Sequence, residues 1–183
     1  MNILTPCQRA AQLIPLALTD APELFALTYG SRAHLRTWLP WVDHVLQPED
    51  TERFVALSMS EVEQGKALHY AIRVNGALAG IISVIDIEQN TGTVGYWIGQ
   101  DFQGHGYMTA ALEQLKHLCF DERNFRHLNL EYLEGNARSA QVAIRCDFFP
   151  VATIPQGAFL YGRALDRIIS RCWPPAVRQT PVL

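Results

Sequence analysis

The segment YWIGQDFQGHGYM, residues 96–108, decides the fold prediction for this chain of 183 residues. Alternating apolar residues at Val94, Tyr96 and Ile98 predict a strand that ends near Gly99. A tight loop with glycines at 104 and 106 follows, and a helix is predicted to begin at once. Glycines let successive N–H groups point into one concavity, and a helix N-terminus attracts a phosphate. The loop is therefore a candidate pyrophosphate site, although a plain turn explains two glycines equally well.

On both sides of this segment, predicted strands and helices alternate without an internal repeat. Asp20 and Glu23 predict a capping box at the start of a helix that should run to about residue 39, where a proline follows. A second helix should open at residue 48, with Phe54, Leu57 and Val62 near helical spacing. The expected strands are 13–18, 68–74, 78–87, 93–98, 128–133, 148–153 and 159–170, and the later helices are 106–120 and 136–145. This order predicts an α/β or α+β sheet with helices on both faces.

Composition narrows the function classes. With 49% hydrophobic residues, 18% charged residues and a net charge of −3, the chain suits one compact domain over residues 1–172, followed by a proline-rich tail over 173–183. There is no basic run to favour a nucleic-acid partner. No apolar run approaches the roughly 18–20 residues of a membrane span, and polar residues interrupt the only candidate signal-peptide core. We therefore expect a cytoplasmic protein without a membrane partner.

The four cysteines, Cys7, Cys119, Cys146 and Cys172, are scattered without a C-x-x-C pair. Neither a zinc site nor a disulfide framework is predicted from this spacing. Isolated buried thiols are the default expectation, so the sequence predicts no metal and no cysteine nucleophile.

Several segments together resemble the GNAT N-acetyltransferases. The loop above is similar to their acetyl-CoA-binding motif, and the likeness to the ribosomal-protein-serine N-acetyltransferase branch runs from about Ile14 to Ser170. It is carried by HLRTWLPWVD (34–43), GYWIG (95–99), FQGHGYMT (102–109), NARS (136–139), Phe148 and YGRALD (161–166). The resemblance implies the GNAT fold, a mixed, mostly antiparallel seven-stranded sheet with splayed central strands and helices on both faces. It also implies direct acetyl transfer from acetyl-CoA to an amine, above all the N-terminal α-amine of a ribosomal protein, and leaves a homodimer open.

The resemblance also suggests roles for individual residues. The backbone amides of Gln103, Gly104, His105, Gly106, Tyr107 and Met108 would hold the pyrophosphate of coenzyme A, and the strand at Trp97, Ile98 and Gly99 would pair with its pantetheine arm. Asn136 would hydrogen-bond the cofactor and Ser139 would protonate the departing thiolate. A helix N-cap explains Asn136 as well, and an ordinary first-turn position explains Ser139. Trp38, Trp41 and Asp43 are candidates for the acceptor groove, although tryptophans also commonly cover a core.

Two positions depart from the family pattern. Asp101 stands where relatives often carry Gln or Arg, which should only weaken phosphate affinity. Counting without gaps from Ser139 places Ala158 where relatives use a glutamate as general base. We expect Glu131 to substitute for it, because its strand should end beside the thioester, with Asp86, Glu88 and His69 as alternatives.

The missing glutamate bears on the acceptor. A free α-amine has a pKa of about 7.7–8.0, whereas a lysine amine has one of about 10.4, so an enzyme with a weak base suits the α-amine. Two other functions remain open. The acceptor could be a small-molecule amine, such as a polyamine, an amino acid or an antibiotic, or the chain could be a catalytically silent acyl-CoA-binding module.

Overall fold

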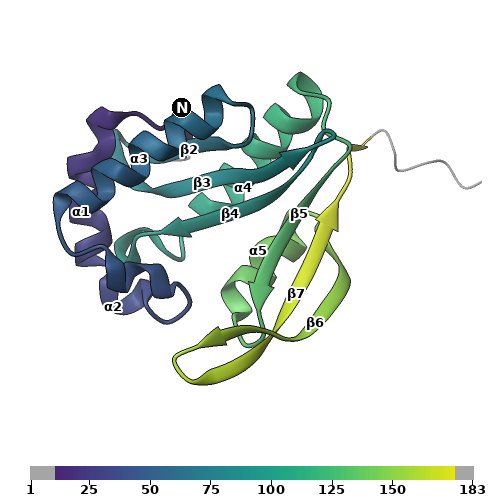
Figure 1. Cartoon of the computed structure of the whole chain (residues 1–183). Coiled ribbons are helices and arrows are strands. Elements are labelled where there is room, and N and C mark those ends of the chain that lie inside the picture. The colour runs from purple at the N-terminus through teal and green to yellow at the C-terminus, as the bar shows by residue number, and fades with distance from the viewer. Residues whose placement is uncertain (1–10, 176–183) are drawn as a thin grey trace, which may run out of the picture.

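The computed structural model describes residues 11–175, which form a seven-stranded sheet flanked by helices (Figure 1). The strand order is β1-β2-β3-β4-β5-β7-β6, and β4 and β5 are parallel while the other neighbours are antiparallel. The strands are β1 Gln12–Pro15, β2 Leu68–Val74, β3 Ala77–Glu88, β4 Thr91–Ile98, β5 His127–Leu133, β6 Phe149–Leu160 and β7 Arg163–Cys172. The helices are α1 Ala21–Gly30, α2 Arg32–Leu35, α3 Pro48–Glu63, α4 Tyr107–His117 and α5 Ala137–Arg145. Short helical segments lie at η1 Leu18–Asp20, η2 Pro40–His44, η3 Gln100–Phe102 and η4 Leu118–Glu122.

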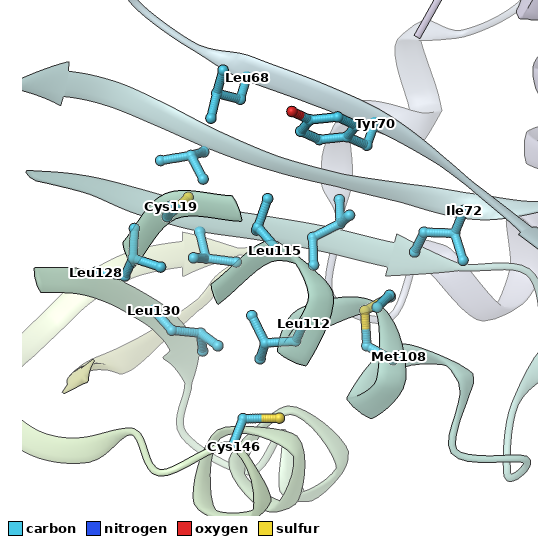
Figure 2. Packing of buried hydrophobic residues seen from close by; sticks show 14 of the residues in the cluster. Leu68, Tyr70, Ile72, Met108, Leu112, Leu115, Cys119, Leu128, Leu130 and Cys146 are labelled. Atoms are coloured by element: carbon cyan, nitrogen blue, oxygen red, sulfur yellow. The ribbon is translucent and has the colours of Figure 1, made fainter. Parts of the chain in front are cut away.

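The two faces of the sheet bury separate apolar clusters. One face packs against α4 and α5, where Met108, Leu112 and Leu115 of α4 meet Leu128 and Leu130 of β5 (Figure 2). The other face packs against α1 and α3 through a smaller cluster: Leu16, Ala21, Leu24, Val55, Ala71, Leu78 and Ile81. The prediction of helices on both faces is therefore confirmed.

The parallel pair at the centre of the sheet separates partway along its length. Hydrogen-bonded pairing of β4 with β5 covers only Thr91–Val94 against His127–Leu130. Beyond it, β4 stays paired with β3, and β5 stays paired with β7 (Figure 1). The predicted splay of the central strands is thus present, and it leaves the facing edges of 95–98 and 131–133 without each other as partners.

The first helix begins after Asp20 as predicted, but it differs from its prediction in the contacts of Asp20 and Glu23 and in where it ends. The Asp20 carboxylate accepts a hydrogen bond from the Ala17 amide and forms an ion pair with Arg73. The Glu23 carboxylate accepts hydrogen bonds from Arg73 and from the Leu78 amide. Both carboxylates therefore fasten α1 to the β2–β3 hairpin, and they do not form the predicted capping box with the backbone amides of the first turn. The helix ends at Gly30, and only the single turn of α2 follows before η2.

The second helix begins at Pro48 as predicted, but the three apolar residues near helical spacing do not form its buried face. Phe54 and Leu57 are 41% and 60% exposed, and Val62 is also exposed. The helix instead buries Val55 together with the small polar residues Thr51 and Ser58. Phe54, Leu57 and Val62 are spaced three and five residues apart, so they do not recur at a strict helical interval. Their positions therefore do not show which side of α3 meets the sheet.

The ends of two expected strands also need correction. The strand expected over 13–18 ends at Pro15, since η1 begins at Leu18. The strand expected over 159–170 contains a hairpin turn at Tyr161 and Gly162, whose φ angles of 47° and 80° are both positive. Positive φ at both central residues is typical of a tight two-residue hairpin. Residues 176–183 of the expected tail, like Cys7, lie outside the described residues.

Within residues 11–175, no helix is long and apolar enough to cross a membrane.

Gly80 allows β3 and β4 to approach closely at the mouth of the splay. A Cβ at this position would lie 2.2 Å from the Trp97 carbonyl oxygen and 2.8 Å from Ile98 Cα. Both neighbours are backbone atoms of β4 and cannot move away alone. The glycine therefore fixes where the free edge of β4 lies.

We predict that Gly80→Ala lowers the free energy of unfolding by about 1–3 kcal/mol, the usual cost of overpacking. It should also weaken binding of the acetyl-CoA that the family resemblance implies, because Trp97 and Ile98 must shift. Gly30→Ala, where a Cβ meets nothing within 4 Å, is the matched control and should be neutral or slightly stabilising. Urea unfolding checks the first effect and titration calorimetry the second. Equal stability of the two variants would contradict the prediction.

Candidate active site

The parting of β4 and β5 forms one side of a cavity of about 940 Å³. Residues from the free edges of both strands, the loop before α4, and the first turns of α4 and α5 line it, and α2 with the segment after it supplies the remaining wall. The predicted site residues among the lining are Trp38, Trp97, Ile98, Gln103, Gly104, Gly106, Tyr107, Met108, Glu131, Asn136 and Ser139. The structure thus brings together eleven predicted residues from five separate segments of the sequence.

The N-terminus of α4 opens into this cavity with unused backbone donors. The helix begins after Gly106, in the left-handed conformation with φ of 78°, and its first internal hydrogen bond runs from the Ala110 amide to the Gly106 carbonyl. The amides of Tyr107, Met108 and Thr109 precede that bond and have no acceptor within the helix. No side chain within the described residues caps this end. These amides and the helix dipole make an anion site.

A polar bridge crosses the cavity mouth beside that anion site. The Gln103 side-chain oxygen accepts a hydrogen bond from Arg138, and its amide nitrogen contacts Nε2 of His34. Since the amide nitrogen can only donate, Nε2 of His34 must accept, which requires a neutral ring. Burial, and secondarily the charge of Arg138, lowers the pKa of His34 below its ordinary value of 6.5. With Gln100 and Gly104, these three residues line a second hollow of about 540 Å³.

Ser139 lies in the first turn of α5 and is held from two sides. Its backbone amide donates to the Oδ1 atom of Asn136 at 3.2 Å, so Asn136 is the N-cap of α5. Its Oγ atom accepts from the Tyr96 hydroxyl at 3.3 Å. Because that lone pair is used, the hydroxyl proton of Ser139 is free to point into the cavity. Burial raises the pKa of Tyr96 to about 12, so the phenol stays protonated at neutral pH.

Glu131 is the one carboxylate among the described residues that line the cavity. Its Oε2 atom lies 3.2 Å from Nη1 of Arg167 in the neighbouring strand β7. None of the alternative bases lines the cavity. His69 is buried on β2 against Ser83 and Glu61, and Asp86 and Glu88 lie near the far end of β3. Ala158, on the edge strand β6, does not line it either.

Four predicted site residues lie outside the lining. The amide of Gly99 is used in the sheet, where it donates to the Ala79 carbonyl at 2.8 Å. The exposed His105 ring packs beside Tyr107, with ring centroids 5.4 Å apart. Trp41 packs against Trp97, with ring centroids 5.9 Å apart, and so supports the cavity wall from outside. Asp43 is bound by Arg36 and by the Tyr161 hydroxyl.

Several lining residues were missed by sequence reasoning. Tyr96, Arg138 and Arg145 belong to the predicted strand 93–98 and the predicted helix 136–145. Only their three-dimensional placement shows that they line the same cavity. His34 opens the HLRTWLPWVD motif but has no predicted role, and Arg167 lies just outside the quoted motifs. Together with Glu131, the three arginines give the cavity an excess of positive charge.

The described thiols do not contribute a reactive group. Cys119, Cys146 and Cys172 are buried, as predicted, and burial raises the pKa of each thiol to about 12. A protonated thiol is a poor nucleophile. Among the described residues, no group of three or more His, Cys, Asp or Glu side chains could hold a metal ion.

Free amides at a helix start beside an unpaired strand edge define the class of protein. The helix start suits a pyrophosphate, and the strand edge suits the amides of a pantetheine arm, so the residues present fit coenzyme A. The acetyltransferase (GNAT) domain family matches residues 11–148, and the chain belongs to this family. It is an acetyl-CoA-dependent acetyltransferase homologous to the ribosomal-protein N-acetyltransferases.

Individual relatives agree in sequence and in fold. The chain is 28% identical over 151 residues to the ribosomal-protein-serine acetyltransferase of Escherichia coli K12, covering 81% of this chain and 84% of that protein. The RimL ribosomal L7/L12 α-N-protein acetyltransferase in complex with coenzyme A has a TM-score of 0.87 at 25% identity, covering 92% and 96% of the two chains. The microcin C7 self-immunity acetyltransferase MccE, in complex with acetyl-CoA and AMP, has a TM-score of 0.86 at 26% identity, covering 93% and 98%.

The lowered pKa of His34 predicts a pH-dependent stability. Because the unfolded chain binds this proton more readily than the folded chain, the free energy of unfolding should fall as the pH drops below about 6.5. His34→Gln should flatten this dependence in part, since the pKa of His127 is lowered in the same direction and its contribution remains. Urea unfolding between about pH 7.5 and pH 5 measures it. The exposed His105→Gln is the control, and an equal flattening in both variants would refute the assignment.

Proposed function

We propose that this chain transfers an acetyl group from acetyl-CoA to the N-terminal α-amine of a protein, with a ribosomal protein as the first candidate. The observation that carries the proposal is that Glu131 is the one carboxylate among the described residues that line the cavity, where it lies 3.2 Å from Arg167. An α-amine, with its pKa of about 7.7–8.0, is already partly neutral at pH 7 and needs little help from a base, whereas a lysine amine, with a pKa of about 10.4, depends on a base far more.

The binding of acetyl-CoA is proposed to use the free backbone groups. The amides of Tyr107 and Met108, with those of the preceding loop, hold the pyrophosphate, and Arg138 adds a positive charge beside it. The free edge of β4 pairs with the pantetheine arm. Amides alternate in direction along a strand, and the Gly99 amide donates to Ala79, so the Ile98 amide faces the parted side. This amide can polarise the carbonyl oxygen of the thioester.

The proton transfers are assigned to Glu131 and Ser139. Acetyl-CoA supplies the acetyl group as a thioester. Glu131, directly or through a water molecule, takes the proton that leaves the α-ammonium group, and the neutral nitrogen forms the new N–C bond. Ser139 donates its proton to the sulfur as the C–S bond breaks, and regains one from solvent, while the nitrogen loses its second proton to water. Tyr96 positions Ser139 by donating to its Oγ atom, and the buried, protonated thiols favour direct transfer over a cysteine-bound intermediate.

An acceptor panel tests the proposal. Purified protein and acetyl-CoA are incubated with Ser-, Ala- and Met-initiated peptides, a lysine peptide with a blocked N-terminus, spermidine and an aminoglycoside, and the products are identified by mass spectrometry. We expect acetylation of the free N-termini alone. Transfer to spermidine or the aminoglycoside instead would replace the proposed acceptor with a small-molecule amine, the second candidate suggested by the AMP complex of MccE. If nothing reacts while acetyl-CoA still raises the melting temperature, a binding module is favoured.

Two variants separate the proposed base from the proposed acid. Glu131→Gln should lower kcat/KM by about 10²-fold near pH 7 and by less at about pH 9, where the acceptor α-amine, with its pKa of about 7.7–8.0, is already neutral and needs no base. Ser139→Ala should lower kcat by a similar factor and leave the shape of the pH profile unchanged, because a serine hydroxyl does not titrate in this range. Steady-state rates with a Ser-initiated peptide measure both. An unchanged profile in Glu131→Gln removes this residue from the mechanism.

A further inference from the structure

Three side chains join two segments that lie 118 residues apart in sequence. The Tyr161 hydroxyl, at the tip of the β6–β7 hairpin, donates to the Oδ2 atom of Asp43 in η2 at 2.9 Å. Arg36 donates through Nε to the Oδ1 atom of the same carboxylate at 2.7 Å. The Arg36 guanidinium also lies over the Tyr161 ring, 4.6 Å from its centroid. Each of the three residues therefore contacts the other two.

The triangle connects the two walls of the cavity on its acceptor side. The η2 segment continues directly from Trp38 and Leu39, which line the cavity. The hairpin strand β7 supplies Arg167 to the opposite wall, beside Glu131. Figure 1 shows the tip of the β6–β7 hairpin reaching toward the region of α2. The same walls also come close at Gly135, where an added Cβ would lie 3.5 Å from the Trp38 ring.

The hairpin tip has little other support. The regular pairing of β5 with β7 ends at Leu133 and Arg167, and beyond it only the Glu134 amide still donates to the Asp166 carbonyl, so residues 163–165 of β7 pair with β6 alone. Phe159 and Tyr161 near the tip are exposed. By contrast, η2 is anchored, since Arg32 donates to the carbonyl groups of Val42 and Val45. The hairpin is therefore the side that can move away.

The triangle is suited to repeated opening. The side chains of Arg36 and Asp43 are 54% and 32% exposed, so water competes for both partners and the ion pair stabilises the closed form only weakly. The contact also occupies both carboxylate oxygens of Asp43. Asp43, a candidate residue of the acceptor groove, is therefore engaged within the chain while the contact is closed.

We propose that Arg36, Asp43 and Tyr161 form a clasp that closes the acceptor side of the cavity and selects acceptors by their width. A slender chain end reaches Glu131 with the clasp closed, whereas an acceptor that is broad next to its amine needs the clasp open. This inference rests on the proposed function, since it specifies which α-amines the same site accepts. A free, unfolded N-terminus fits a closed clasp.

Two acceptors with the same reacting amine test the clasp. One is a linear Ser-initiated peptide, and the other carries a second peptide branch on the side chain of its second residue. Tyr161→Phe removes the hydrogen bond to Asp43 but keeps the ring under Arg36, and Asp43→Asn removes the charge. In both variants we expect kcat/KM for the branched peptide to rise relative to the linear one by up to about tenfold, the effect of one lost hydrogen bond. The change should appear in KM, with the affinity for acetyl-CoA unaltered.

The control is Tyr29→Phe. Tyr29 is an exposed tyrosine of α1 whose ring also lies near an arginine, Arg32, at 5.6 Å, but it is outside the clasp. It should leave the ratio of the two peptides unchanged. The double variant Tyr161→Phe/Asp43→Asn should raise the ratio of the two peptides about as much as either single variant does, because both substitutions remove one shared interaction. A ratio that stays at the wild-type value in the clasp variants overturns the proposal.

A second readout needs no acceptor and separates this inference from the proposed function. Hydrogen exchange should accelerate in Tyr161→Phe above all at residues 159–163, and less at residues 40–45, because Arg32 still anchors η2 when the shared contact is lost. If no α-amine reacts, the proposed function fails, and the ratio is then measured with linear spermidine against a ring-containing aminoglycoside. If no amine reacts at all, the hydrogen exchange of Tyr161→Phe alone tests the clasp. Unchanged exchange in both segments overturns the clasp.

Discussion

The parting of β4 from β5 after Val94 and Leu130 is the constraint on which the rest of the site depends. A strand that leaves its partner exposes amides and carbonyl groups that must find another ligand or water. Here β3 and β7 each keep one of the two strands in the sheet, so the opening is held from both sides without their own pairing. Gly80 contributes by letting β3 approach the β4 backbone at Trp97 and Ile98, beyond the point where the two strands part.

The same parting explains why two helix starts face one cavity. The two central strands are parallel, so their carboxyl ends lie at the same end of the sheet, and the chain leaves each of them there to begin α4 and α5. The first turns of both helices therefore converge on the opening, one with free amides and the other with Asn136 and Ser139. Ligands commonly bind beyond the carboxyl ends of parallel strands for this reason.

The charges around the opening are arranged by contacts that local sequence patterns do not contain. Glu131 meets Arg167 because β5 pairs with β7, and Asp43 meets Tyr161 because a hairpin tip reaches η2. In both cases an isolated acid in the sequence proves to be already paired. An acidic residue near an expected site therefore indicates affinity for a cation only when its partners in the fold are known.

The sequence by itself determined the order of strands and helices, the glycine loop before α4, the family, and eleven of the residues that line the cavity, because these follow from local periodicity and from motif likeness. It did not determine where α1 ends, which side of α3 is buried, or the turn at Tyr161 and Gly162. Nor did it bring Tyr96 to Ser139 or His34 to Gln103. Those outcomes depend on pairing and packing between segments far apart in the chain, and only the tertiary structure could decide them.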